Sequence, residues 1–274
     1  MPRATRPFPR APMKYGDLQL HALPEGRFTV GLDKRFVPYA EGDPPRPGTL
    51  FISVTPFLVH APGETLLIDT GLGSWADGRG TEQIVGALAA HGVGPESVDR
   101  VILSHLHFDH SGGAITAVGA EWRPTFPRAT YVVQRAEATA AGYAGESARA
   151  RDLVLETLDR EGQVAWADGD ADLGIVSLTV TGGHTGAHQT VTLRSGALAA
   201  VFGGDVLGTP GSALRRYVAK YDADGETSAR WRERIAREAA DAEHLLLFYH
   251  SAGSPAAFLH DDGDGRLAVE AVDM

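Results

Sequence analysis

Alternation of apolar and polar residues predicts most of the regular structure of this 274-residue chain. A period of two over roughly four to eight residues is typical of strands with one buried face. Strands are expected over residues 17–23, 27–31, 50–60, 64–70, 100–104, 129–134, 173–181, 188–194, 197–202, 245–249 and 267–272. The turn Ala61-Pro62-Gly63 predicts that the two strands beside it pair with each other.

A longer period predicts helices between these strands. Helical patterns cover residues 81–91, 135–143, 147–161 and 227–242. Gly92 ends the first of them, because glycine is typical of the position after a helix. In the last, Trp231, Ile235 and Ala239 recur every four residues, which indicates one buried face.

Two segments lack either period. Residues 1–14 are rich in proline and arginine and predict a flexible N-terminal arm, followed by a single domain over residues 15–274. Residues 32–48 contain too many glycines and prolines for regular structure, so we expect an irregular loop there. Phe36 and Tyr39 in this loop are candidates for the substrate pocket, as parts of a lid, or for anchoring the loop to the core.

Bulk composition argues against several classes of partner. The formal net charge is −10 and the sequence pI is near 5.5, so we expect no nucleic-acid partner. No run approaches the roughly 18 apolar residues that span a bilayer, and the N-terminal residues lack the apolar stretch of a secretory signal. We therefore expect a cytoplasmic protein with no membrane partner, and a homodimer is the commonest assembly for such a chain.

The candidate chemistry lies in residues 104–113, SHLHFDHSGG, directly after an apolar run that ends a predicted strand. His105 and His107 would leave an extended chain on the same side, and Asp109 and His110 follow in the turn. Because cysteine is absent, only His, Asp and Glu can bind a metal, and these ligands suit zinc and similar divalent ions. A chance cluster on a loop is the alternative, and the density of histidines in this stretch favours a metal site.

Three further candidate ligands lie where strands are expected to end. His184 stands in the glycine-rich turn TGGHTGAHQ, Asp205 follows the strand over residues 197–202, and His250 follows the strand over residues 245–249. Taken singly, each is more simply a core or turn residue. Together with the first cluster they supply enough ligands for two metal ions.

The order of these residues resembles the metallo-β-lactamase-fold hydrolase superfamily. The stretches SHLHFDHSGG, TGGHTGAHQ and GGD, with LLIDTGLG at residues 66–73, are similar to motifs of that superfamily, and the resemblance covers roughly residues 50–250. It implies an α+β fold, a four-layer αββα sandwich of two central sheets and outer helices. It also implies a pair of metal ions at one edge, between the sheets.

The resemblance further implies a role for each candidate residue. Three ligands would hold a first metal, three a second, and one would bridge them: His105, His107 and His184; Asp109, His110 and His250; and Asp205. Asp69 resembles the carboxylate of the superfamily that orients the ligands, although a turn cap is an equally simple interpretation. The implied cofactors are two divalent metal ions, most simply zinc, with manganese, cobalt or iron as alternatives.

The reaction that the resemblance implies is hydrolysis of a lactone or small ester. Two cations that share a water lower its pKa and produce a bridging hydroxide, and Asp109 is a candidate for the catalytic proton carrier. The quorum-quenching N-acyl homoserine lactonases and related hydrolases are the most similar branch, supported by the chain length and by YHSAGSP at residues 249–255. Those lactonases place a tyrosine three residues after the bridging aspartate, where this chain has Gly208. Tyr217 and Tyr221 are candidates to replace it in the substrate pocket.

The sequence is also compatible with other reactions. The same ligands would serve an aryl ester or organophosphate hydrolase, or a thioester hydrolase similar to glyoxalase II. A mononuclear iron persulfide dioxygenase and a metal-holding scaffold without turnover are alternatives of other classes. Metal content, together with a panel of lactone and ester substrates, would separate them.

Overall fold

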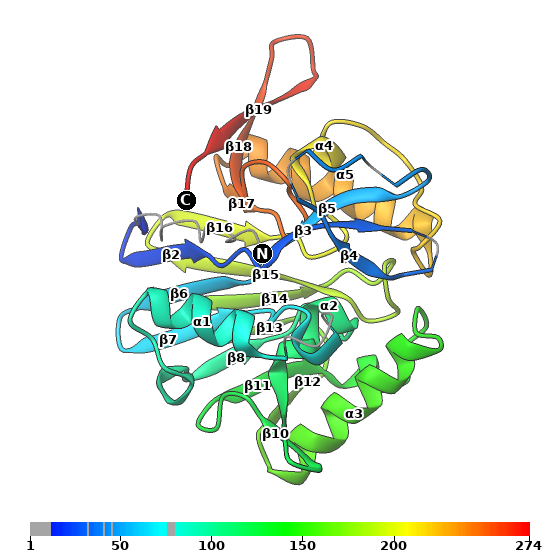
Figure 1. Cartoon of the computed structure of the whole chain (residues 1–274). Coiled ribbons are helices and arrows are strands. Elements are labelled where there is room, and N and C mark those ends of the chain that lie inside the picture. Colours follow the sequence, from blue (N-terminus) through cyan, green and yellow to red (C-terminus); the bar gives the residue numbers. More distant parts are fainter. Residues whose placement is uncertain (1–11, 32, 41, 45, 76–79) are drawn as a thin grey trace.

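Two seven-stranded sheets lie face to face at the centre of the protein (Figure 1). The computed structural model describes residues 12–31, 33–40, 42–44, 46–75 and 80–274. The first sheet has the order β1 (Met13–Tyr15), β2 (Leu18–Ala22), β6 (Phe57–Ala61), β7 (Glu64–Ile68), β8 (Arg100–Ile102), β11 (Thr130–Gln134), β12 (Val164–Ala167). The second has the order β13 (Ala171–Asp172), β14 (Val176–Val180), β15 (Gln189–Ser195), β16 (Leu198–Phe202), β17 (Leu245–Leu247), β18 (Ala256–Asp261), β19 (Leu267–Val272).

Three apolar cores define four layers. The first core lies between the sheets and takes residues from both, such as Leu20 of β2 and Leu193 of β15. The second lies between the first sheet and the helices α1 (Glu82–Ala90) and α3 (Glu146–Arg160). The third lies between the second sheet and α5 (Gly225–Asp241). The expected αββα sandwich is therefore confirmed.

The described residues also form shorter helical segments. They are α2 (Phe108–Ser111), α4 (Pro210–Ala213) and four 3₁₀ turns, η1 (Gly73–Trp75), η2 (Pro95–Ser97), η3 (Gly112–Ala114) and η4 (Arg135–Thr139). The helix predicted over residues 135–143 is wrong in extent, because the 3₁₀ turn ends at Thr139. The helix predicted over 227–242 begins two residues earlier, where the side chain of Asp224 caps it by accepting a hydrogen bond from Thr227 N.

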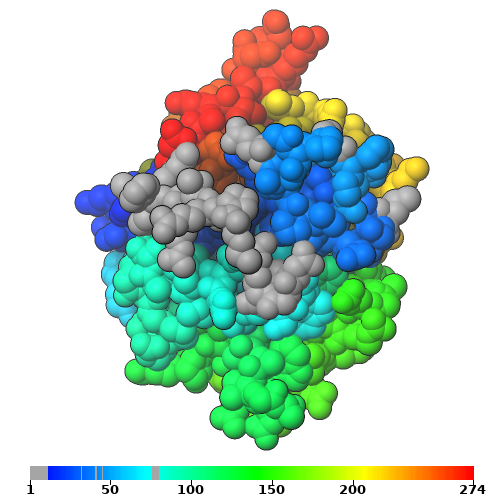
Figure 2. Space-filling model, viewed as in Figure 1, coloured from blue at the N-terminus to red at the C-terminus, as the bar shows by residue number. Residues whose placement is uncertain are grey.

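A separate three-stranded sheet, β4 (Phe36–Pro38), β3 (Gly26–Val30) and β5 (Leu50–Val54), corrects two predictions. The strand predicted over residues 50–60 is broken before β6, at Pro56, whose nitrogen cannot donate a hydrogen bond. The predicted irregular loop contains β4, which is held by pairing with β3 rather than by a pattern of its own. Figure 2 shows the blue residues of this small sheet on the surface of the molecule, where Leu50 and Phe51 are exposed.

Several strands were not predicted. One of these is the hairpin of β9 (Ile115–Val118) and β10 (Glu121–Pro124), whose turn contains Gly119 in the left-handed region. The strands β12, β13 and β18 were also not predicted. Every residue of β12 is half-buried, so no alternation marks it as a strand. Of the predicted arm, Met13 and Lys14 form part of β1, and residues 1–11 lie outside the described residues. No helix in the described part of the chain is both long and apolar enough to cross a membrane.

Candidate metal centre

Parallel pairing brings the candidate ligands to one edge of each sheet. In the first sheet β7 and β8 run parallel, so Asp69 and the motif that begins at Ser104 both follow carboxyl ends of neighbouring strands. In the second sheet β16 and β17 run parallel, which places Asp205 and His250 beyond the same edge. His184 lies in the turn between β14 and β15. Sequences that are far apart along the chain therefore meet where the two edges face each other.

Three imidazole rings converge in the first group of ligands. The distance from His107 Nδ1 to His105 Nε2 is 2.9 Å, and that to His184 Nε2 is also 2.9 Å. His107 Nε2 donates to the carbonyl oxygen of Gly142 at 3.2 Å, which leaves a lone pair on Nδ1. His184 Nδ1 donates to the carboxylate of Asp222 at 2.9 Å, which leaves a lone pair on its Nε2. Lone pairs that face each other at this distance repel, so the arrangement fits a cation between the rings.

The second group combines two imidazoles with a carboxylate. Asp109 Oδ2 lies 3.6 Å from both His110 Nε2 and His250 Nε2. Each ring is oriented through its other nitrogen, since His250 Nδ1 donates to Ser53 O at 2.8 Å and His110 Nδ1 donates to Asp69 Oδ2 at 2.7 Å. The nitrogens that face Asp109 are therefore the ones that can bind a metal.

The carboxylate of Asp205 lies between the two groups. Its Oδ2 is 3.2 Å from His184 Nε2, and its Oδ1 is 3.0 Å from His110 Nε2 and 2.9 Å from His250 Nε2. Asp205 Oδ1 and His110 Nε2 are buried and make no hydrogen bond within the described part of the chain. Buried polar atoms of this kind are costly without a partner, and a metal ion would supply one.

The seven predicted ligands thus form two groups within which the ligand atoms lie within 4.8 Å of one another. The groups are His105, His107, His184 and Asp205; and Asp109, His110 and His250. Burial, reinforced by the neighbouring histidines, holds the pKa of His105 well below its usual value, so this ring is neutral near pH 7. The facing histidines outweigh the burial of Asp205 and hold the pKa of its carboxyl well below the usual range. Neutral imidazoles and an ionised carboxylate are the forms in which these groups bind metals.

Asp69 makes the contacts that both interpretations of it require. Its Oδ1 accepts a hydrogen bond from Ser104 N and its Oδ2 accepts one from Ser104 Oγ, each at 2.7 Å, so it caps the turn after β8. The same Oδ2 orients the ring of His110. The backbone of Asp69 is in the left-handed region, with φ of 55°, a conformation that aspartate adopts more readily than most residues.

Two buried residues that support the centre were not predicted. Asp222, beside His184, also faces Arg232, whose Nη2 lies 3.9 Å from its Oδ2 and whose side chain is buried in α5. Arg232 donates to the carbonyl oxygens of Val206 and Tyr217. This arginine therefore ties the segment after Asp205 to the segment that carries Asp222. No local pattern indicates either residue, because they are remote from the ligand motifs along the chain.

Glu137 is a third buried residue that sequence reasoning missed. Its Oε1 accepts hydrogen bonds from Thr185 Oγ1 at 2.6 Å and from Ala187 N at 3.0 Å, and its Oε2 accepts one from Leu106 N at 3.3 Å. Burial raises the pKa of this carboxyl. Glu137 links the loop before His107 to the loop that carries His184, and so helps to fix the first group of ligands.

The four candidate pocket residues lie in different surroundings in the structure. The ring of Phe36 lies 5.6 Å from that of Phe108, next to the metal centre, whereas Tyr39 packs 4.8 Å from Phe51 and anchors the small sheet. Tyr217 is stacked under the guanidinium of Arg232 at 4.0 Å. The ring of Tyr221 lies 5.9 Å from that of His184 and is 45% exposed.

Gly208 leaves the space beside His250 without a side chain. A Cβ at Gly208 would lie 3.4 Å from Cδ2 of the His250 ring, an ordinary contact distance. A side chain at this position would therefore stand directly beside the second group of ligands. Tyr221 is an aromatic residue that stands next to the first group of ligands with an exposed face.

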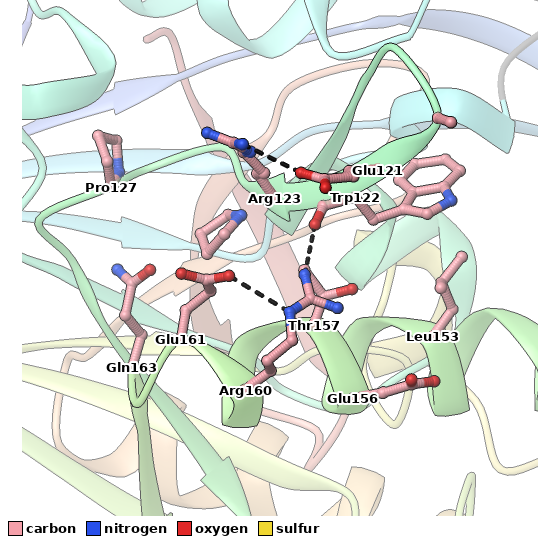
Figure 3. Close-up of a pocket in the computed structure, with 12 residues that line it drawn as sticks. Glu121, Trp122, Arg123, Pro127, Leu153, Glu156, Thr157, Arg160, Glu161 and Gln163 are labelled. Carbon is pink, nitrogen blue, oxygen red and sulfur yellow. Dashed lines mark hydrogen bonds and ion pairs between the residues drawn. The ribbon is translucent and has the colours of Figure 1, made fainter.

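A cavity of about 810 Å³ lies away from these ligands, between β10 and α3 (Figure 3). Four charged side chains in its wall pair with each other, Arg123 with Glu121 and Arg160 with Glu161. None of the seven candidate ligands lines it. We therefore locate the candidate chemistry at the sheet edges rather than in this cavity.

The sequence of the chain is similar to that of known proteins. A family model described as the metallo-beta-lactamase superfamily matches residues 50–250. An N-acyl homoserine lactonase of Bacillus cereus is 29% identical over 168 residues, which are 54% of this chain and 62% of that protein. The N-acyl homoserine lactonase AttM of Azorhizobium caulinodans is 30% identical over 129 residues, 44% of this chain and 45% of that protein. The matched segments thus span less than two thirds of these relatives.

Solved structures share the whole fold at low identity. AidC, a dizinc quorum-quenching lactonase in complex with a product, superposes with a TM-score of 0.77 at 17% identity, over 96% of this chain and 97% of that one. The hydrolase AbOPH of the beta lactamase superfamily has a TM-score of 0.80 at 19% identity, over 98% and 99% of the two chains. At these identities the likeness shows the fold.

Proposed function

Because this chain belongs to the metallo-β-lactamase superfamily, we propose that it is a metal-dependent hydrolase that opens lactones or small esters, N-acyl homoserine lactones among them. The observation that carries the proposal is the convergence of His105 Nε2, His107 Nδ1 and His184 Nε2, with Asp205 reaching from this group to the second. The lactonase relatives support the choice of substrate class.

We assign the seven ligands to two divalent ions, most simply zinc. His105, His107 and His184 would hold one, Asp109, His110 and His250 the other, and Asp205 would contact both. When bound, such ions lower the pKa of a shared water and polarise the substrate carbonyl. The residues outside the ligand set keep each ring in the tautomer that presents its free nitrogen to the ion.

Asp109 is the residue that we assign to proton transfer. Its Oδ2 is 3.6 Å from both histidines of its group, a looser approach than the 2.9 and 3.0 Å of Asp205 Oδ1 to the same nitrogens. Burial raises the pKa of Asp109, so its carboxylate accepts a proton more readily than an ordinary aspartate. The proton that Oδ2 takes from the attacking water would pass to the leaving oxygen when the ester bond breaks.

Tyr221 is the side chain that we assign to substrate binding. It stands beside His184 and is partly exposed, and burial followed by the neighbouring Tyr217 raises its pKa, so the hydroxyl is a hydrogen-bond donor at neutral pH. Phe36 supplies an apolar wall next to Phe108. A polar contact to the ester and an apolar surface for its acyl part are what an acyl lactone requires.

The test is a substrate panel with matched variants. Protein loaded with two equivalents of zinc, manganese or cobalt should hydrolyse a medium-chain N-acyl homoserine lactone faster than an aryl ester, a phosphotriester or a thioester. The change His107→Ala should lower kcat/KM by at least about 100-fold, because it removes a ligand nitrogen. His244→Ala, at a partly exposed histidine outside the centre, should keep the wild-type rate.

Three results would contradict the proposal. Turnover of aryl esters or phosphotriesters without turnover of lactones would reject the lactonase assignment while leaving a hydrolase. An unchanged rate in His107→Ala would reject the metal centre as the site of reaction. One iron per chain together with oxygen uptake would replace hydrolysis by oxidation.

A further inference from the structure

A second group of histidines lies on the outer face of the first sheet. It is separate from the seven candidate ligands at the sheet edges, which we call the strand-end centre. His21 is in β2, His60 is in β6, and His91 caps the C-terminus of α1. The registers Gln19↔His60 and His21↔Leu58 make His21 and His60 diagonal neighbours across the two strands. The ring of His21 lies 5.5 Å from that of His60 and 4.3 Å from that of His91.

The central ring of this group has no hydrogen-bond partner among the residues that the structure describes. His21 is only 7% exposed, and neither its Nδ1 nor its Nε2 makes a hydrogen bond with any of them. An imidazole carries one N–H donor and one lone pair, and leaving both unpaired in a buried position costs about 1–3 kcal/mol for each group. Apolar packing alone would be better served by a leucine or phenylalanine. The buried nitrogens therefore need an unseen partner.

Charge favours a cation as that partner. Burial and the neighbouring His91 and His60 lower the pKa of His21 to about 4, so its lone pair is free at neutral pH. The ring separations are similar to the 4.7 and 4.8 Å between the histidines of the first ligand group. The nine-residue helix α1 ends at this point, has no basic residue in its last turn, and directs its partial negative charge to the same place.

We propose that His21, His60 and His91 bind one divalent transition-metal ion, separate from the centre at the strand ends. Neutral imidazole suits zinc, nickel and copper. Among the described residues, only the strand-end groups have three or more ligand atoms already within 4.8 Å of one another. Binding here therefore requires new rotamers of His60 and His91, whose partly exposed rings can turn toward the fixed ring of His21.

The test counts metal ions in the full-length protein. Wild type, the double variant His60→Ala/His91→Ala and the control His244→Ala/His260→Ala are dialysed to equilibrium against micromolar Zn²⁺, and separately Ni²⁺, at pH 7.5. We expect the first double variant to bind one ion fewer per chain than wild type, and the control, which removes two histidines elsewhere, to bind the same number. Equal counts in wild type and His60→Ala/His91→Ala would overturn the proposal and assign the partner of His21 to water.

A second measurement, the Tm with added Ni²⁺, tests whether altered folding of the double variant explains a lower metal count. Added Ni²⁺ should raise the Tm of protein whose strand-end centre is already saturated with zinc, and this rise should be lost in His60→Ala/His91→Ala. No rise in wild type would also overturn the proposal. The result does not depend on the proposed hydrolase, because the same difference of one ion should persist when His107→Ala has removed a ligand of the strand-end centre. Loss of activity and loss of this ion are therefore distinguishable outcomes.

Discussion

At the scale of single residues, hydrogen bonds decide which nitrogen of each histidine can bind a metal. A carbonyl or carboxylate oxygen accepts from one ring nitrogen of His107, His184, His110 and His250, so the other nitrogen is the one that can bind a metal. Asp222 gives this support to His184 and is in turn close to the buried guanidinium of Arg232.

The change Asp222→Asn should weaken metal binding without removing a ligand. An asparagine can present either an oxygen or an NH₂ group to His184 Nδ1, and it loses the charge that faces Arg232. We expect zinc affinity, measured by competition with a chromogenic chelator, to fall roughly 10- to 100-fold. Asp168→Asn, at an exposed ion pair with Arg135, should leave it unchanged. Wild-type affinity in Asp222→Asn would show that the carboxylate does not orient the ring.

The seven candidate ligands could be named from the sequence because they lie in or beside turns at strand ends and because their order resembles the motifs of the superfamily. Asp222 could not, since it lies 38 residues from His184 and is brought to it only by the fold. Glu137 is hidden in the same way, in a stretch with a helical period. Residues that orient ligands need only reach them in space, so their position along the chain carries no signal.

At the scale of elements, the centre depends on two turns that pack backbone against backbone. The turn after β7 and the turn after α2 meet where a Cβ at Gly113 would lie 2.0 Å from Thr70 O, and Gly113 N donates to Gly71 O at 3.1 Å. This contact sets Asp69 against the histidine motif. Glycine is required here by the closeness of the two backbones.

Gly113→Ala should therefore destabilise the protein, by about 1–3 kcal/mol of unfolding free energy, because the methyl group forces the two turns apart. The matched control is Gly86→Ala in α1, where nothing lies within 4 Å of the new Cβ. That change should stabilise by about 0.5–1 kcal/mol, since alanine favours the helix. Urea denaturation measures both, and a Gly113→Ala variant as stable as wild type would refute the close contact.

The small sheet of β4, β3 and β5 shows that local patterns do not always predict which strands pair. Residues 50–60 read as one strand because their apolar pattern continues through Pro56, yet β5 pairs with β3 and β6 pairs with β2 and β7. The partner of a strand is a long-range property, and the alternation of side chains is the same in either sheet. Local patterns therefore predicted most individual strands of the three sheets, but not β1, β4, β12, β13 or β18, and they did not indicate that β5 pairs with β3.

At the scale of the whole molecule, bound metal should contribute to the stability of the fold. The ligands come from both sheets, and ions that bind only the folded chain stabilise it by mass action. Removing metal with a chelator should lower the Tm by roughly 5–15 °C. Calorimetry of loaded and stripped protein tests this, and His107→Ala should show a smaller difference. Equal Tm values for loaded and stripped wild type would argue against occupancy of the centre.

Stability should also depend on pH through His21. Its pKa is about 4 in the folded chain and about 6.5 when unfolded, so between these values the unfolded chain binds more protons. The free energy of unfolding that His21 supplies is complete above pH 6.5 and is lost as the pH falls towards 4. In the presence of chelator, wild type should lose on the order of 2 kcal/mol more than His21→Leu between pH 7 and pH 5. His260→Leu should follow wild type, and equal losses in wild type and His21→Leu would contradict the prediction.

The hydrogen bond from His250 Nδ1 to Ser53 O has a consequence for folding during synthesis on the ribosome. The two residues are 197 positions apart, and the ligands between them emerge in the order of the two sheets. A nascent chain that has released His105 and His107 lacks His184, Asp205 and His250. The complete set of proposed ligands exists only after synthesis has passed His250, so a second ion, if the chain binds two as proposed, would mark a chain whose two sheets have already closed on each other.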